Sequence, residues 1–195
     1  IGIAVMELIG GYTDYVEKFE FLSDLRQKLA GTIFEKNNWL YTLFWRLGAT
    51  LAYVYYFRGL LKSGSQQRVL KLMASGFVVA CMVIISSNFN DFFVRSFPAI
   101  TIMSSLLIII STVMYLMQIL QSDRIINFYR SLNFYMAAVL LVWNLIITPL
   151  IFYDVYYSRS DMPYVVLKHS IYLFSNIFMY LSFSIALLCC KPENL

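Results

Sequence analysis

The chain has 195 residues, of which 60% are hydrophobic and 13% are charged, and it carries a net charge of +4. Soluble domains carry roughly 25% charged residues, so this composition predicts an integral membrane protein and excludes a soluble globular domain. The basic residues are spread over connectors beside apolar segments, as membrane topology requires, and this pattern excludes a nucleic-acid-binding module.

The first apolar segment, residues 1–12, would be about 18 Å long as a helix, which is shorter than the ~30 Å hydrocarbon core. We read it as a truncated first helix and expect residues upstream of Ile1. The connector that follows carries an apolar stripe with helical spacing: Val16, Phe19, Leu22, Leu25 and Leu29. This stripe predicts an amphipathic helix over 15–30 that lies along the membrane interface.

Five complete apolar segments follow, each near or above the roughly 20 residues that a spanning helix needs. They cover residues 39–61, 69–87, 98–119, 132–153 and 165–190. Pro149 is a candidate break or kink in the fifth helix, and Pro163 is expected in the loop before the sixth. The predicted fold is therefore all-α, a polytopic membrane bundle of about six transmembrane helices that forms a single domain over 1–195.

Orientation is predicted from the basic residues near the ends of the segments. A purely basic connector follows the second helix, with Arg58, Lys62, Arg68 and Lys71, and Arg124 and Arg130 follow the fourth. The two sides carry equal numbers of basic residues, so the prediction depends on this clustering. It places both termini in the cytoplasm and the protein in a bacterial inner membrane.

Arg46 is the unusual residue of the second helix, because a charge at membrane depth is costly. It lies about 10 Å below the outer boundary, and Glu7, on the first helix, lies at a similar depth. Adjacent antiparallel helices would pair the two charges. This pair is either a structural clasp or part of a ligand or ion site, and Arg46 alone could also extend its charge toward the headgroups.

Other polar residues gather in the same outer half of the predicted bundle. Asn88 and Asp91 follow the third helix, Asn144 and Asp154 belong to the fifth, and His169 and Asn176 belong to the sixth. Midway along a helix, an asparagine is expected to bond to a neighbouring helix. Each residue alone is explained by packing, but together with Glu7 and Arg46 they outline an outward-facing polar cavity.

No motif of an enzyme or a metal site accompanies this cluster. The sequence lacks GxSxG, HExxH, P-loop and paired-carboxylate patterns, and His169 has no second ligand within helical reach. The cysteines, Cys81, Cys189 and Cys190, lie in apolar segments without metal or redox spacing. We therefore expect no catalytic residues, no metal and no cofactor.

Four short stretches carry a resemblance to a known group: MELIGG at 6–11, NNWLYTLF at 37–44, SLNFYMAAVLLVW at 131–143 and YLFSNIFMYLSFSIALLCC at 172–190. In these the chain resembles small multi-spanning membrane proteins of the Bacteroidota that are similar to membrane portions of sensor histidine kinases. The resemblance implies a membrane sensor or accessory role and brings no binding residues.

Two functions remain open at this point. The first is a non-enzymatic sensor or accessory subunit that acts through a membrane protein partner or as a homo-oligomer. The second is a small-molecule carrier, or a lipid-binding or lipid-modifying protein, that uses the polar cavity.

Overall fold

The fold was analysed in a computed structural model that describes residues 9–29, 31–122, 131–153 and 162–190. These residues are helical almost throughout and contain no strand. Four helices are long and apolar enough to cross a membrane: α6 (Gly64–Ser87), α8 (Pro98–Leu120), α9 (Leu132–Tyr153) and α10 (Met162–Cys189). The prediction of a helical membrane bundle is therefore confirmed.

The segment predicted as the second spanning helix is also helical without interruption from residue 38 to 60, but its hydrogen-bond register changes twice. It consists of α4 (Asn38–Tyr41), the π-helix η2 (Thr42–Ala49) and α5 (Thr50–Leu60). No single one of these three pieces reaches spanning length. The predicted first helix falls largely on residues 1–8, which lie outside the described part of the chain.

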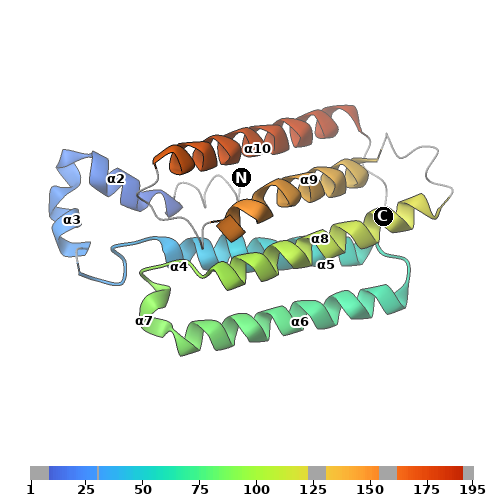
Figure 1. Ribbon diagram of the computed structural model, residues 1–195, viewed down its shortest axis with the longest axis horizontal. Coiled ribbons are helices and arrows are strands. Elements are labelled where there is room, and N and C mark those ends of the chain that lie inside the picture. The colour runs from blue at the N-terminus through green and yellow to red at the C-terminus, as the bar shows by residue number, and fades with distance from the viewer. Residues whose placement is uncertain (1–8, 30, 123–130, 154–161, 191–195) are drawn as a thin grey trace.

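The expected interfacial helix over 15–30 is divided into three short pieces. They are α2 (Tyr12–Lys18), η1 (Glu20–Leu22) and α3 (Ser23–Leu29), and they lie beyond one end of the long helices (Figure 1). The break falls at Phe19, whose φ of −102° and ψ of 116° are extended. Val16 is buried, whereas Phe21 and Leu25 are exposed.

Two helix starts differ from the sequence expectation for local reasons. α6 begins at Gly64, five residues before the predicted start, because the polar residues Gln66, Gln67 and Arg68 sustain a helix although they are not apolar. α10 begins at Met162 and includes Pro163, which was expected in the loop. Proline is tolerated in the first turn because its missing N–H would have no helical partner there.

Pro149 lies inside α9, which continues to Tyr153, so the proline does not end this helix.

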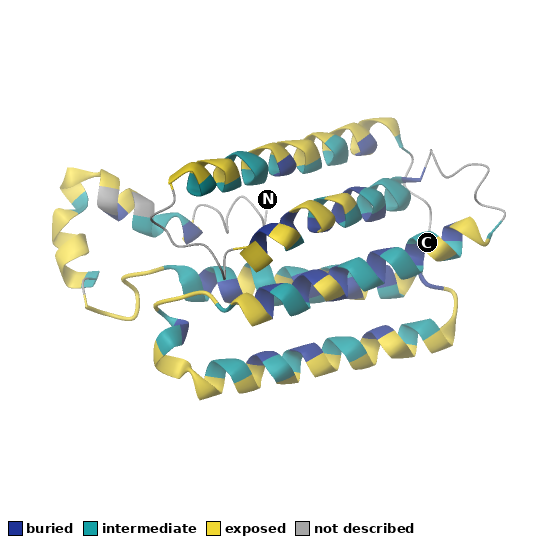
Figure 2. Cartoon of the chain, viewed as in Figure 1, coloured by how far each residue is buried: buried dark blue, intermediate teal, exposed yellow. Residues whose placement is uncertain are grey.

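The central helix of the bundle is α8, which packs against α9, α5 and α6, while α10 packs on α9 (Figure 1). A short helix, α7 (Phe89–Phe92), turns the chain between α6 and α8. The main core lies among α5, α6, α8 and α9 and includes the fully buried Phe57, Leu70 and Cys81. The outer faces of α6 and α10 are largely exposed (Figure 2), as expected for helices that face lipid.

Candidate functional site

A pocket of about 380 Å³ lies beside this core, and Leu140 belongs to both. Four successive residues of one helical face, Thr101, Ser104, Ser105 and Ile108, form its wall on α8. The remaining lining comes from five helical elements, α4, η2, α5, α9 and α10, and from the turn that precedes α8. These lining residues are Asn38, Tyr41, Thr42, Trp45, Arg46, Ala49, Tyr53, Ser96, Phe97, Leu140, Trp143, Asn144, Tyr172, Asn176, Met179 and Tyr180. Its volume falls within the range of roughly 300–1,000 Å³ that small-molecule sites occupy.

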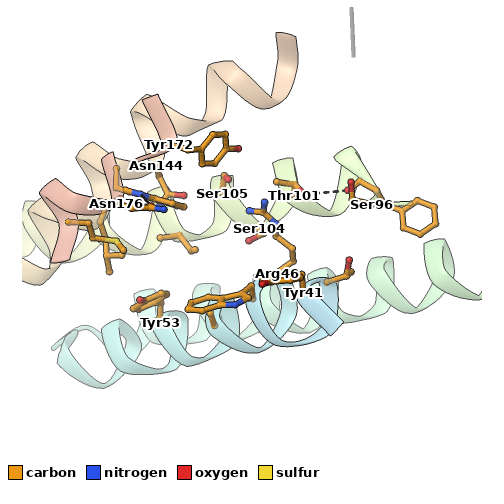
Figure 3. A pocket seen from close by; sticks show the side chains of 18 of the residues that line it. Tyr41, Arg46, Tyr53, Ser96, Thr101, Ser104, Ser105, Asn144, Tyr172 and Asn176 are labelled. Atoms are coloured by element: carbon orange, nitrogen blue, oxygen red, sulfur yellow. Dashed lines mark hydrogen bonds between the residues drawn. The ribbon is translucent and has the colours of Figure 1, made fainter. Parts of the chain in front are cut away.

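The pocket separates two helical units that pack on different neighbours. η2 and α5 pack on α8, and α10 packs on α9, whereas no comparable contact joins α10 to η2 or α5. Figure 3 shows side chains from both units pointing into the space between them.

Among the described residues that line the pocket, Arg46 has the only charged side chain. It extends from η2 toward α8 (Figure 3), and its guanidinium interacts with the side chain of Tyr172 on α10. Within the described residues, the only ion pair joins Arg95 to Asp91, which lies outside the pocket. No described carboxylate therefore neutralises Arg46.

The backbone that carries Arg46 is held by two hydroxyl contacts. Thr50 donates its hydroxyl hydrogen to the carbonyl of Arg46 at 2.6 Å, and the Thr50 and Ser104 hydroxyl oxygens lie 2.6 Å apart in a buried contact. The second contact ties α5 to α8. Arg46 lies within the π-helix η2. Because π-helical turns occur often at functional sites, this location favours a functional role for the part of the pocket around Arg46.

Two buried polar groups of the wall have unused hydrogen-bonding capacity. Asn144 is 1% exposed, and its amide donates only to the carbonyl of Leu140, at 2.9 Å. Ser105 is 3% exposed and has no partner within the described residues. Buried polar atoms normally find a partner, so these two groups are suited to bind a ligand or an ordered water.

Asn176 is engaged instead, because it accepts a hydrogen bond from the indole Nε1 of Trp143 at 2.9 Å. This bond joins α10 to α9 across the back of the pocket and is the interhelical contact expected of a mid-helix amide. It also orients the indole ring that lines the pocket.

Polarity changes along the pocket. Near the end of the bundle where α4 and α8 begin, the walls present Asn38, Thr42 and Thr101. Asn38 donates to the carbonyl of Val94 at 2.8 Å, which ties these two beginnings together. Further along, beyond Arg46, the walls present Ile108 and Leu140. The remaining deep residues are Ala49, Tyr53, Met179 and Tyr180.

The structure brings together only part of the polar cluster predicted from sequence. Arg46, Asn144 and Asn176 line the pocket. The exposed Asn88, which follows α6, donates to the carbonyl of Ile84 in that helix, and Asp91 pairs with Arg95.

His169 is also exposed, with its Nδ1 at 3.2 Å from the carbonyl of Val165. Asn88, Asp91 and His169 therefore do not line the pocket. Glu7 and Asp154 fall outside the described residues, so the predicted pairing of Glu7 with Arg46 stays a prediction.

The sequence reasoning did not identify the aromatic part of the site. Trp45, Trp143 and Tyr172 were taken as parts of apolar segments, although all three line the pocket. Ser104 and Ser105 were read as small residues for close helix packing. The available signal was the spacing of Thr101, Ser104 and Ser105, which places three hydroxyls on one face of an otherwise apolar helix.

No group of three or more His, Cys, Asp or Glu in the described part of the chain is arranged to hold a metal ion. Comparison with known proteins finds no matching family model, no matching curated protein and no matching solved structure.

Proposed function

We propose that this chain is an integral membrane protein that binds a small molecule in the pocket and acts as a sensor through a partner protein. The observation that carries this proposal is a cavity that contains one arginine and two buried, incompletely bonded polar groups, Asn144 and Ser105. A bundle that only needed stability would fill this space, because interiors are close-packed. The sequence resemblance to membrane portions of sensor kinases supports the same reading.

The proposed topology has six spanning helices, with the two termini in the cytoplasm of a bacterial cell and the chain in its inner membrane. The four long apolar helices and the helical run over 38–60 support five of these spans, and the segment 1–12 would supply the sixth. In this orientation the polar end of the pocket, at Asn38, faces outward. Labelling of Ser65→Cys and Ser160→Cys in intact cells tests the topology, since only position 160 should react from outside.

A carrier is the second candidate, and η2 favours it. Transporters often bind their substrates where a helix departs from regular α-helical geometry near mid-membrane, and η2 is such a departure beside the pocket, although the run over 38–60 stays helical. In proteoliposomes, accumulation of the bound molecule would support the carrier, whereas binding without accumulation supports the sensor.

Ligand binding itself is tested by a substitution that fills the pocket. Ser105→Leu places a larger side chain into the cavity, and Ser75→Leu is its control because Ser75 is an exposed serine of α6. The proteins are purified in mild detergent, and bound small molecules are extracted and compared by mass spectrometry. A molecule enriched on the parent chain and on Ser75→Leu, and lost from Ser105→Leu, is the expected result; equal profiles from all three would contradict ligand binding in the pocket.

A partner is tested on the same material. Proteins that co-elute with the parent chain are identified, and we expect a membrane protein partner or a homo-oligomer. A chain that purifies alone as a monomer would argue against the sensor reading and leave the carrier.

A further inference from the structure

We infer that the pocket accepts an anionic amphiphile, a molecule with a carboxylate or phosphate monoester head and an apolar body. This inference rests on the proposed function and adds the chemical class of the ligand. It follows from the position of the single charge, from the polar groups around that charge and from the change in polarity along the walls.

The positive charge of Arg46 favours a ligand with an anionic head group. A guanidinium presents several N–H donors in a planar fork that matches a carboxylate or a phosphate. In a helix that spans a membrane, an uncompensated charge is unfavourable, and no described acidic side chain lines the pocket. An anionic head beside Arg46 would supply a negative charge that no described residue of the pocket supplies.

The surrounding polar groups can bind the same head. The hydroxyl of Ser105 and the amide of Asn144 have hydrogen-bonding capacity left, and Tyr172 reaches the guanidinium from α10. Figure 3 shows Arg46, Ser105, Asn144 and Tyr172 around a common space. This space is reached by side chains of η2, α8, α9 and α10, so one head group would contact all four elements.

The part of the pocket that lies beyond Arg46, away from Asn38, favours a ligand with an apolar body. From Asn38 to Tyr53 the lining helix advances fifteen residues, or about 20 Å at the α-helical rise of 1.5 Å per residue, and Arg46 lies near the middle of this length. Beyond it the walls carry the side chains of Ile108 and Leu140, with Met179 from α10, and the aromatic rings of Tyr53 and Tyr180. A polar head at Arg46 therefore continues into a space suited to an alkyl or aromatic group.

The test uses three ten-carbon probes that differ only in the head: decanoate, decyl phosphate and decanol. The protein is reconstituted in nanodiscs of neutral phosphatidylcholine, and binding is followed by tryptophan fluorescence, because Trp45 and Trp143 line the pocket. Titrations are compared at equal membrane concentrations of each probe. We expect the two anions to bind at least about tenfold more tightly than decanol, which corresponds to about 1.4 kcal/mol.

Variants locate this preference. Arg46→Gln should bind the anions and decanol equally, Arg46→Lys should keep part of the preference, and Arg68→Gln, which removes an exposed arginine of α6, should keep all of it. If Arg46→Gln does not fold, the comparison of probes on the parent chain still decides the inference. An anion preference that survives Arg46→Gln would overturn the role of Arg46.

The remaining outcomes separate the inference from the function on which it rests. Decanol binding as tightly as decanoate would overturn the anionic class and leave ligand binding in place. Acetate and inorganic phosphate binding as tightly as the decyl probes would overturn the apolar body and indicate a free anion. No response to any probe, together with no co-purified molecule, would overturn the proposed function as well.

Discussion

Two faces of α8 differ in how closely they are packed. The face toward α5 and α6 meets Phe57, Leu70 and Cys81, all fully buried, and forms a closely packed apolar core. The face toward η2, α9 and α10 presents hydroxyl groups to a cavity of about 380 Å³. In a membrane, apolar packing within the bundle competes with equally apolar lipid, so the packed face provides shape and stability while the hollow face is available for binding.

The largest effect should follow from a change in the packed half. Phe57 contacts Tyr56 and Tyr115, with ring centroids 5.3 and 5.7 Å apart, and Phe57→Ala should destabilise the protein by about 3–5 kcal/mol. Tyr53→Ala, four residues earlier on the same helix but lining the pocket, should cost about 1 kcal/mol or less. Thermal unfolding in detergent measures both, and equal losses would remove the contrast between the two faces.

The next largest effect on stability should follow from removal of the charge of Arg46, which lines the pocket. If Glu7 is the resident partner of Arg46, Glu7→Gln and Arg46→Gln should each lower stability, by as much as about 3–5 kcal/mol for a fully buried pair, and less if the cavity holds water. The double variant should recover part of the loss, and exchange of the two charges should recover most of it.

Gly10, three residues after Glu7 in the chain, lies near the start of the Arg46 helix, since its carbonyl accepts a hydrogen bond from Asn37 and a Cβ added to it would lie 3.0 Å from the ring of Tyr41, a residue of the pocket wall. Additive losses across the cycle would show that the two side chains do not interact. If they do interact, Glu7→Gln should also tighten the binding of anionic probes, because Glu7 and the probe would compete for one guanidinium.

A smaller effect is expected where the two faces are tied together. Thr50→Val removes the buried hydroxyl contact with Ser104 and should cost about 0.6–2 kcal/mol, the range for hydrogen bonds between membrane helices. Ser104→Ala should cost less than Thr50→Val, because Thr50 also bonds to the Arg46 carbonyl. The double variant should lose less than the sum, since the shared contact disappears only once; strict additivity in the melting data would contradict the contact.

The smallest effect on stability should come from Ser105→Leu. It fills existing space and removes a buried hydroxyl that has no described partner, so unfolding should change by no more than about 0.5 kcal/mol although ligand binding is lost. A large destabilisation would show that the cavity is already filled by atoms that the leucine displaces.

The sequence predicted the elements whose boundaries are set by composition alone. α9 begins and ends where an apolar run begins and ends, and Pro98 marks the first residue of α8. The change to π-helical register at Thr42 could not be predicted, because apolar residues fill α-helical and π-helical turns equally well. The early start of α6 was missed because its first turn is polar.

The site was only partly predictable for a geometric reason. Residue counts along a helix give the depth of a side chain, and depth grouped Arg46, Asn144 and His169 into one layer. Direction around the helix axis depends on packing with neighbours, and this direction separates Asn144, which lines the pocket, from His169, which does not. The spacing of Thr101, Ser104 and Ser105 was the one pattern that indicated on which side of a helix its polar side chains lie. These residues belong to α8, the central helix of the bundle.

The place of α10 in the chain has a consequence for biogenesis. This helix is the last of the described elements to be synthesised, and it brings Tyr172, Asn176 and Met179 to a wall that η2, α8 and α9 have already formed. It is held mainly by α9. Since chains are made from the N-terminus, the pocket is complete only after α10 has docked, and any ligand that binds the finished pocket stabilises that docked state by mass action. If the proposed ligand binding holds, supply of the ligand would therefore raise the fraction of newly made protein in which α10 has docked.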